Sequence, residues 1–379
     1  MTYTFSFPTL IKFGAGSRHQ VADTLKEKHL KKPLVVTDRG VVKQDFFSNF
    51  VDELSKADLK VSVFSEIFGN PVKSQVSNGV KAFLANECDS IVAIGGGAVL
   101  DVAKAIALMA THPGDLFDYE DGKPNALPVT DAIPFWVALP TTSGTGSEVG
   151  RSAVVSDDET HMKKIIFSPK LLAPVVFADP ELTLNIPAPI TAATGMDALT
   201  HLVEAYLAKG YHPVCDGIAL EGIRLVSENL AKCVHNPEDL PARSEMMMAS
   251  MMGAIAFQKG LGLVHSCAHA LSTVADLHHG LANGIMVDHA LKFNVSQVPE
   301  KFERIAQTVG LESPTTENFF GWLEKLKRDI GIPAKLSEVN ITADKIERLS
   351  EVAINDACHQ CNPKECNQDD FRRIFSESL

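Results

Sequence analysis

Carboxylate and imidazole side chains recur at a spacing of four residues in the second half of the sequence. Asp197 and His201 form one such pair, His265 and His269 form another, and a histidine doublet follows at residues 278–279. Side chains four residues apart lie on one face of a helix, so each pair can direct two groups to one point. The spacing therefore predicts that this stretch converges on a single site.

The chemistry of these side chains favours a metal. An aspartate with three imidazoles is a ligand set that iron(II) or zinc accepts, and no cysteine occupies the best-spaced positions, as a closed structural zinc site would require. Any one of the histidines alone would fit a helix surface or a hydrogen-bonded core equally well. Two pairs in apolar helices and a further histidine before Gly280 instead indicate a catalytic metal site.

The elements around these residues have helical patterns. After Asp179-Pro180, strand-like runs give way to long stretches rich in Ala, Leu and Met that continue to the end of the sequence. Two prolines within Ile186–Pro189 interrupt the chain where the composition changes. We therefore expect two domains, residues 1–187 and residues 188–379, of which the second is all-helical.

Short β-branched runs alternate with helical patterns in the first half. They lie at Pro33–Thr37, Lys60–Phe64, Ser90–Ile94 and Phe135–Leu139, and two more short strands are expected at Thr4–Phe7 and Leu10–Phe13. Strands separated by helices form right-handed βαβ units and a doubly wound parallel sheet. The expected fold class is a Rossmann-like α/β domain followed by an all-α domain, with ligands at the carboxyl ends of the strands.

Two loops at those carboxyl ends are rich in glycine and hydroxyl groups. Gly95–Gly97 follow one strand and open a helix, so that backbone amides and the helix N-terminus can approach a phosphate. Residues 140–148, PTTSGTGSE, offer hydroxyl and amide donors to a pyrophosphate or a ribose. A plain tight turn and a surface Ser/Thr turn are the alternatives. The glycine run does not match the G-x-G-x-x-G fingerprint of dinucleotide-binding folds.

Composition excludes several classes of partner. The 379-residue chain carries a net charge of -12, whereas nucleic acids and anionic membranes require a basic face. We expect no secretory signal, and the longest apolar run, Met246–Phe257, is too short to span a membrane. Seven cysteines, an odd number, favour reduced thiols in a cytoplasm. Cys358, Cys361 and Cys366 lack a second matching pair, which favours a loop thiol cluster over a zinc knuckle.

Four ordered motifs resemble those of the iron-containing (group III) alcohol dehydrogenase family. They are GGGxxxDxAK at residues 95–104, LPTTSGTGSEV at 139–149, GMDALTHLVEAY at 195–206 and GLGLVHSCAHAL…HHG at 260–280. The resemblance covers essentially the whole chain, including the late Asp356-Ala-Cys…Asn362-Pro363 segment. It implies the fold shared with dehydroquinate synthase, in which a Rossmann-like domain binds a nicotinamide dinucleotide and a helical domain binds one divalent metal.

The resemblance also implies roles for the histidines. The implied metal ligands are Asp197, His201, His265 and His279. Iron(II) is the expected metal and zinc the alternative. His278 is then a neighbour of the site, because the family's ligand directly precedes the glycine. His269 matches an additional active-site histidine that is implicated in proton transfer or substrate contact.

The implied cofactor contacts fall in the first domain. They are Asp38, Asn70, Gly95, Gly96, Gly97, Ala98, Asp101, Thr141, Thr142, Thr145, Val154, Lys163 and Leu182. Ala98 replaces the family's usual serine, which costs on the order of 1 kcal/mol of cofactor binding if nothing replaces the hydroxyl. The carboxylate of Asp38 can accept hydrogen bonds from ribose hydroxyls and repel a 2′-phosphate, so NAD is expected over NADP, although Arg39 beside it would soften this preference.

The expected function is hydride transfer between NAD and a primary alcohol, a diol or a hydroxy acid, which gives the aldehyde reversibly and depends on the metal. The expected partners are a small alcohol or aldehyde and, by family resemblance, a second copy of the chain in a homodimer. The alternatives are a dehydroquinate-synthase-like lyase that uses NAD and a metal, a metal-free maleylacetate-reductase-like enzyme, which would lack Asp197, and a non-catalytic nucleotide-binding scaffold.

Overall fold

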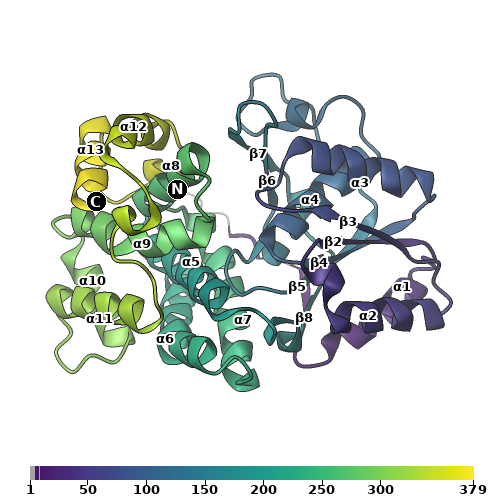
Figure 1. Ribbon diagram of the computed structural model, residues 1–379, viewed down its shortest axis with the longest axis horizontal. Coiled ribbons are helices and arrows are strands. Elements are labelled where there is room, and N and C mark those ends of the chain that lie inside the picture. Colours follow the sequence, from purple (N-terminus) through teal and green to yellow (C-terminus); the bar gives the residue numbers. More distant parts are fainter. Residues whose placement is uncertain (1–4, 8) are drawn as a thin grey trace. The chain divides into compact units, whose positions relative to one another are not determined.

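The computed structural model describes residues 5–7 and 9–379, and the chain divides into two compact units (Figure 1). The N-terminal unit contains residues 6–142 and 147–183. The C-terminal unit contains residues 184–379 together with Phe5 and Ser143–Gly146. The chain thus enters the helical unit at residue 184, slightly earlier than the expected boundary at 188, and a short part of the glycine-rich loop belongs to that unit as well.

A parallel sheet forms the centre of the N-terminal unit, and its strands have the order β1-β8-β5-β4-β2-β3. The four inner strands are buried along nearly their whole length, as expected for a parallel sheet covered on both faces, whereas the edge strands are partly exposed. The strands are β1 (Leu10–Phe13), β2 (Pro33–Asp38), β3 (Ser62–Ile67), β4 (Ser90–Gly95), β5 (Phe135–Pro140) and β8 (Val175–Ala178).

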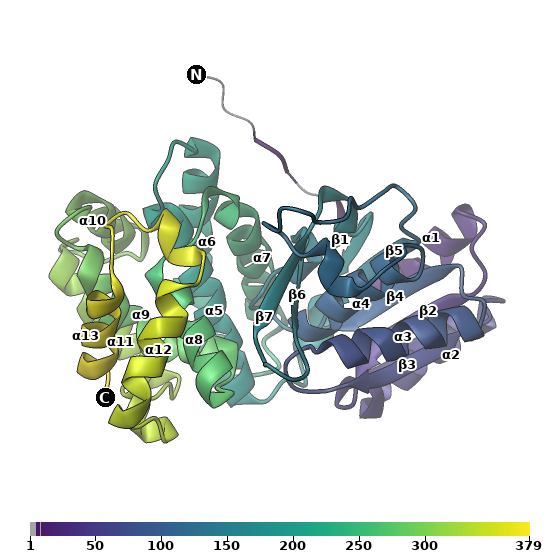
Figure 2. The same cartoon turned by 90° about the horizontal axis from the view of Figure 1, so that it is seen from above.

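Helices cover both faces of this sheet, α1 and α2 on one and α3 and α4 on the other (Figures 1 and 2). The strand register pairs Val35 with Val92 and Val92 with Val137, and this row packs with Leu25 of α1 and Phe50 of α2 in one hydrophobic core. The helices are α1 (Val21–Glu27), α2 (Asp45–Lys56), α3 (Lys73–Ala85) and α4 (Gly97–Met109). A separate antiparallel hairpin, β6 (Ser152–Ser156) and β7 (Lys163–Phe167), packs against α4 through β6.

The C-terminal unit consists of helices around one large apolar core. Proline stands at the first or second position of α5, α6, α7 and α10, where its missing N–H costs no hydrogen bond. Its helices are α5 (Ala188–Leu207), α6 (Pro213–His235), α7 (Leu240–Ala256), α8 (Leu263–Ala275), α9 (His279–Leu291), α10 (Pro299–Thr308), α11 (Thr316–Asp329), α12 (Ile346–Ile354) and α13 (Gln368–Glu377).

The expected fold class is confirmed, with a parallel α/β sheet followed by a helical half. The expected strand at Leu10–Phe13 is β1, but residues 5–7 form no strand, and Thr4 lies outside the described residues. Within residues 5–7 and 9–379, no single helix is long and apolar enough to cross a membrane, and only the bent pair Leu240–Lys259 and Leu263–Ala275 passes that test together.

Candidate active site

Three helices of the C-terminal unit bring the predicted metal ligands together. Asp197 and His201 lie on α5, His265 lies on α8, and His279 is the first residue of α9. These helices pack closely, and Gly280 allows the approach, because a Cβ there would lie 2.5 Å from the carbonyl oxygen of Ala193 on α5 and 3.4 Å from the Cβ of Asp197. The His-Gly sequence therefore places the start of α9 against α5.

One ligand atom from each of the four side chains lies within 4.8 Å of the others. The Nε2 atom of His279 is 3.3 Å from Oδ1 of Asp197, and Nε2 of His265 is 3.9 Å from the same oxygen. Ligands about 2.1 Å from one ion stand apart by similar distances. Three of the four side chains are buried, and that of His279 is 23% exposed, so the cluster reaches the surface of its unit at His279.

The protonation states also suit a divalent cation. Burial alone would raise the pKa of Asp197, but the neighbouring His201, His279 and His265 hold it well below its usual range. Burial lowers the pKa of His201 to about 4. A charged carboxylate and a neutral imidazole are the forms that bind metals, so the donor set fits the ion that the sequence implies.

His278 has a different task from His279. It is the N-cap residue of α9, and its Nδ1 accepts a 3.4 Å hydrogen bond from the backbone N–H of Leu281. Of the doublet, only His279 lies in the four-residue cluster.

His269 lies beside this cluster, with its ring stacked at 5.2 Å on that of His279. Its Nδ1 is 2.8 Å from Oδ2 of Asp356, and Oδ1 of Asp356 accepts hydrogen bonds from Ser266 Oγ and the backbone N–H of Cys358. Burial would raise the pKa of Asp356, but His269 and these donors lower it below its usual range. Asp356 is therefore an anionic partner for His269.

The cysteines near the C-terminus form no site of their own. All seven cysteines are free, and Cys358 instead lies close to His269 and Asp356. Burial raises the pKa of Cys358 well above its ordinary value, which favours the neutral thiol.

Two further polar residues of the cluster were missed in the sequence. Asn283 is fully buried, and its Nδ2 donates a 2.7 Å hydrogen bond to Oδ1 of Asp197. Glu204 is 2.6 Å from Nδ1 of His265, and burial raises its pKa to about 7. The spacing of both residues from predicted ligands could have indicated them. Asn283 follows His279 by four residues and Glu204 follows Asp197 by seven, and such spacings place side chains on one face of a helix.

The predicted phosphate-binding segments meet in the N-terminal unit at the carboxyl ends of β4 and β5. Gly95 ends β4, Gly96 is the N-cap of α4, and the backbone N–H of Thr141 donates to the carbonyl of Gly95. A Cβ on Gly96 would lie 3.2 Å from Oγ1 of Thr142. The glycine run and the hydroxyl-rich loop are thus neighbours at the N-terminus of α4, the kind of position at which proteins bind phosphate.

The other expected cofactor residues occupy varied positions. Asp38 ends β2, and its Oδ1 accepts hydrogen bonds from the backbone of its own turn at Gly40 and Val41. The side chain of Asp101 is held by Ser147 and by the backbone of Val154. The remaining positions are Gly97 and Ala98 in the first turn of α4, Asn70 before α3, Thr145 in the loop segment that belongs to the C-terminal unit, Lys163 at the start of β7, and Leu182 in the core beneath the sheet.

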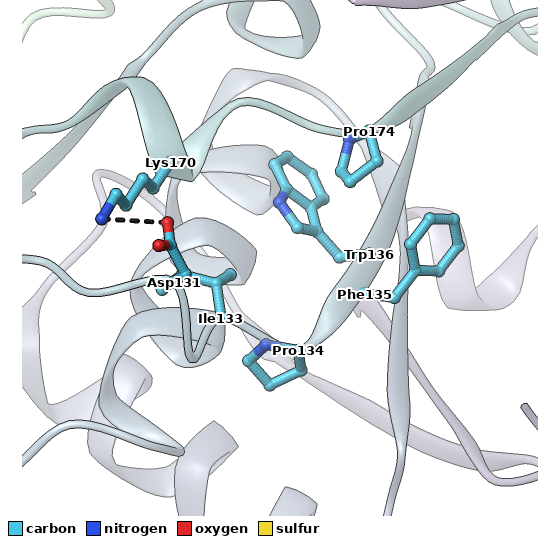
Figure 3. Close-up of a pocket in the computed structure, with 7 residues that line it drawn as sticks. All are labelled: Asp131, Ile133, Pro134, Phe135, Trp136, Lys170 and Pro174. Carbon is cyan, nitrogen blue, oxygen red and sulfur yellow. Dashed lines mark ion pairs between the residues drawn. The ribbon is translucent and has the colours of Figure 1, made fainter.

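A hollow of about 290 Å³ lies at the opposite end of β5 (Figure 3). Phe135 and Trp136, the first residues of that strand, line it, and an ion pair between Lys170 and Asp131 borders it. Parallel sheets bind their ligands at the carboxyl ends of the strands, so this hollow is distinct from the expected cofactor segments.

Known proteins match both halves of the chain. Residues 8–180 match the family model for iron-containing alcohol dehydrogenase, and residues 191–379 match the C-terminal model of the Fe-containing alcohol dehydrogenase family. The chain is 37% identical over 360 residues to 4-hydroxybutyrate dehydrogenase of Cupriavidus necator, covering 92% of this chain and 93% of that protein. It is 36% identical to NAD-dependent methanol dehydrogenase of Bacillus methanolicus, covering 99% of each. A crystal structure of 1,3-propanediol oxidoreductase superposes with a TM-score of 0.94 at 35% identity over 100% of both chains. The chain therefore belongs to the iron-containing alcohol dehydrogenase family.

Proposed function

We propose that Asp197, His201, His265 and His279 hold one divalent ion, iron(II) in the first place and zinc as the alternative, at the centre of an alcohol dehydrogenase. The observation that carries this proposal is the convergence of one carboxylate and three imidazoles within 4.8 Å. An ion bound there supplies Lewis-acid polarisation of the substrate oxygen.

His269 is the residue to which we assign proton transfer. Asp356 is ionised and can only accept a hydrogen bond, so the Nδ1 atom of His269 carries a proton and donates a hydrogen bond to this carboxylate. The Nε2 atom is then left to exchange the proton of the substrate hydroxyl, directly or through water. The stacking of His269 on His279 keeps that nitrogen near the ligand cluster.

NAD is the cofactor that supports this reaction, with Gly95–Gly97, Thr141 and Thr142 around its phosphates and Asp38 at the adenosine ribose. The 2′-phosphate of NADP would be repelled by the negative charge of Asp38. The guanidinium of the neighbouring Arg39 stacks on Phe68, 4.0 Å from the ring centre. A kcat/KM for NADP equal to that for NAD would contradict the assignment of Asp38.

The substrate is a small primary alcohol, a diol or a hydroxy acid, in keeping with the alcohols named for the relatives. We further infer a cytoplasmic homodimer. The free state of all seven cysteines supports a reducing compartment. The edge strand β1 exposes Leu10 and Phe13 by 57% and 41%, which supports pairing with a second copy; a single-chain mass by light scattering would contradict the dimer.

The test measures the metal content of the purified protein together with its rate of alcohol oxidation. Protein purified without oxygen should contain about one divalent ion per chain and reduce NAD with an alcohol from a panel of primary alcohols, diols and hydroxy acids. Chelation should abolish this activity, and adding back iron(II) or zinc should restore it. Activity that is indifferent to a chelator would contradict the proposal.

The histidine doublet provides a matched pair of variants. His279→Ala removes a proposed ligand and should lose both metal and turnover. His278→Ala removes the cap of α9 and none of the four proposed ligands, so it should keep the metal while losing about 1 kcal/mol of stability. Equal loss of metal in both variants would contradict the assignment of His279.

A further inference from the structure

Three backbone N–H groups and one imidazole nitrogen converge on the carboxylate of Glu204. This residue lies on α5, seven positions after Asp197, and is 2% exposed. Its Oε2 accepts from the backbone N–H groups of Gly262 (3.1 Å) and His265 (3.3 Å) and lies 2.6 Å from Nδ1 of His265. Its Oε1 accepts from the backbone N–H of Val264 at 2.7 Å.

The backbone donors are the N-terminal N–H groups of α8. This helix begins at Leu263, and its N-cap residue, Gly262, has no side chain that could accept them. Such groups need an acceptor, and a negative charge near a helix N-terminus is favourable. Glu204 supplies this cap from α5. It thereby fixes the first turn of α8, which carries His265, against the helix that carries two of the other proposed ligands.

Glycine at position 262 keeps room for this contact. A Cβ there would lie 2.6 Å from Oε1 of Glu204 and 3.0 Å from Oδ1 of Asn362. The backbone of Gly262 is extended, with a φ of -150°, so any residue could adopt it. The glycine is therefore required by the carboxylate rather than by the backbone conformation.

We propose that Glu204 is the positioning residue that holds His265 ready for the metal, an inference that rests on the metal site proposed above. A carboxylate 2.6 Å from Nδ1 favours the tautomer of the neutral imidazole that carries its proton on Nδ1, which leaves the lone pair on Nε2. That nitrogen is the one that faces Asp197, 3.9 Å from Oδ1. Without Glu204, the imidazole can take either tautomer, and the first turn of α8 loses its acceptors.

The test compares Co²⁺ binding by the full-length metal-free protein and by the variant Glu204→Gln. Glutamine keeps the size of the side chain but removes the charge and offers one acceptor oxygen instead of two. The dissociation constant for Co²⁺ should rise by about 10- to 100-fold, and the visible absorption of the bound Co²⁺ should change with the position of the imidazole.

Asp288→Asn is the matched control. Asp288 on α9 is also buried and is paired with the buried Lys327, away from the proposed ligands. This variant removes a carboxylate that is about as buried as that of Glu204, so it should lower thermal stability. The dissociation constant for Co²⁺ and the Co²⁺ spectrum should stay unchanged. If it weakens Co²⁺ binding as much as Glu204→Gln does, general destabilisation explains the result and the positioning role is overturned.

Gly262→Ala tests the same contact without changing Glu204. The end of the glutamate side chain is flexible, so the added methyl group should displace the carboxylate without unfolding α8, and Co²⁺ binding should weaken in the same direction. Wild-type Co²⁺ binding in both variants would overturn the role of Glu204. A wild-type protein that takes up no Co²⁺ would instead overturn the metal site itself, and this inference with it.

Discussion

Asp356 holds His269 in one orientation because the carboxylate is itself fixed from two sides. Its Oδ1 accepts hydrogen bonds from Ser266 Oγ at 2.7 Å and from the backbone N–H of Cys358 at 2.9 Å, which leaves Oδ2 to face Nδ1 of His269. An imidazole between a fixed carboxylate and a substrate oxygen is a common arrangement for proton transfer. The proposed proton-transfer residue, His269, is thus separate from the four proposed metal ligands.

Asp356→Asn should therefore impair turnover and leave the metal in place. The amide carries no charge to fix the proton on Nδ1 of His269, so kcat should fall at least about 10-fold, which is part of the roughly 10²- to 10⁴-fold that proton-transfer groups contribute. Metal content and kcat are to be measured on the same preparation. Ser266→Ala, which removes only one support of Asp356, should have a smaller effect. Wild-type kcat, or loss of the metal, would contradict this assignment.

Part of this site could be predicted from the sequence, and the spacing of its residues decides which part. The spacing of four residues between Asp197 and His201 predicts, without a structure, that both side chains lie on one face of a helix. The partnership of His269 with Asp356 spans 87 residues of chain, and no local pattern connects them. The spacing of Glu204 from Asp197 indicates a shared helix face, but its role depends on the N-terminus of α8, which only the structure places beside it.

Helix α4 is tied to the hairpin through a buried lysine. Lys104 is fully buried, and its Nζ lies 2.6 Å from Ser147 Oγ, 2.8 Å from the carbonyl of Ser152 and 3.3 Å from Oδ1 of Asp101. Asp101 also accepts from Ser147 and from the backbone of Val154 on β6. The helix whose N-terminus is the proposed phosphate site is thus fixed to the segment that follows the hydroxyl-rich loop.

Lys104→Met should destabilise the N-terminal unit by about 3 kcal/mol, because removing one partner leaves the carboxylate of Asp101 poorly compensated. Urea unfolding followed by the fluorescence of Trp136, in a Trp322→Phe background that removes the second tryptophan, measures this change. The double variant Lys104→Met/Asp101→Asn removes both charges and should recover part of the loss. Equal stability of wild type and Lys104→Met would show that the lysine does not hold these elements together.

The hairpin and one inner strand were the elements that the sequence did not predict. β2, β4 and β5 appear as compact β-branched runs, since they are buried on both faces. β8 lies between β1 and β5 in the sheet, but it was not predicted because it has only four residues, Val175–Ala178. The strands of the hairpin, β6 and β7, pair only with each other, so the βαβ alternation that revealed the parallel sheet carries no information about them.

Each unit of the molecule contains most of the groups for one of the two proposed ligands, and among the expected cofactor residues Thr145 is the exception. The four proposed metal ligands and their supports Glu204 and Asn283 all come from α5, α8 and α9 of the C-terminal unit. The glycine run of α4 and the first two threonines of the loop after β5 belong to the N-terminal unit. A ligand that binds only the folded state stabilises the elements that hold it, by about 2.7 kcal/mol at a hundred times its dissociation constant.

Hydrogen exchange should therefore show two distinct patterns of protection. Co²⁺ added to the metal-free protein should slow exchange in α5, α8 and α9, because it joins three helices that are otherwise held by packing and by the Glu204 cap. NAD should slow exchange at residues 95–104 and at Thr141 and Thr142. Peptides from α11 and α13, which supply neither ligand set, serve as the internal reference. Protection of the parallel sheet by Co²⁺, with α5, α8 and α9 unchanged, would contradict the division of ligands between the units, because an ion held by these helices has to stabilise them first.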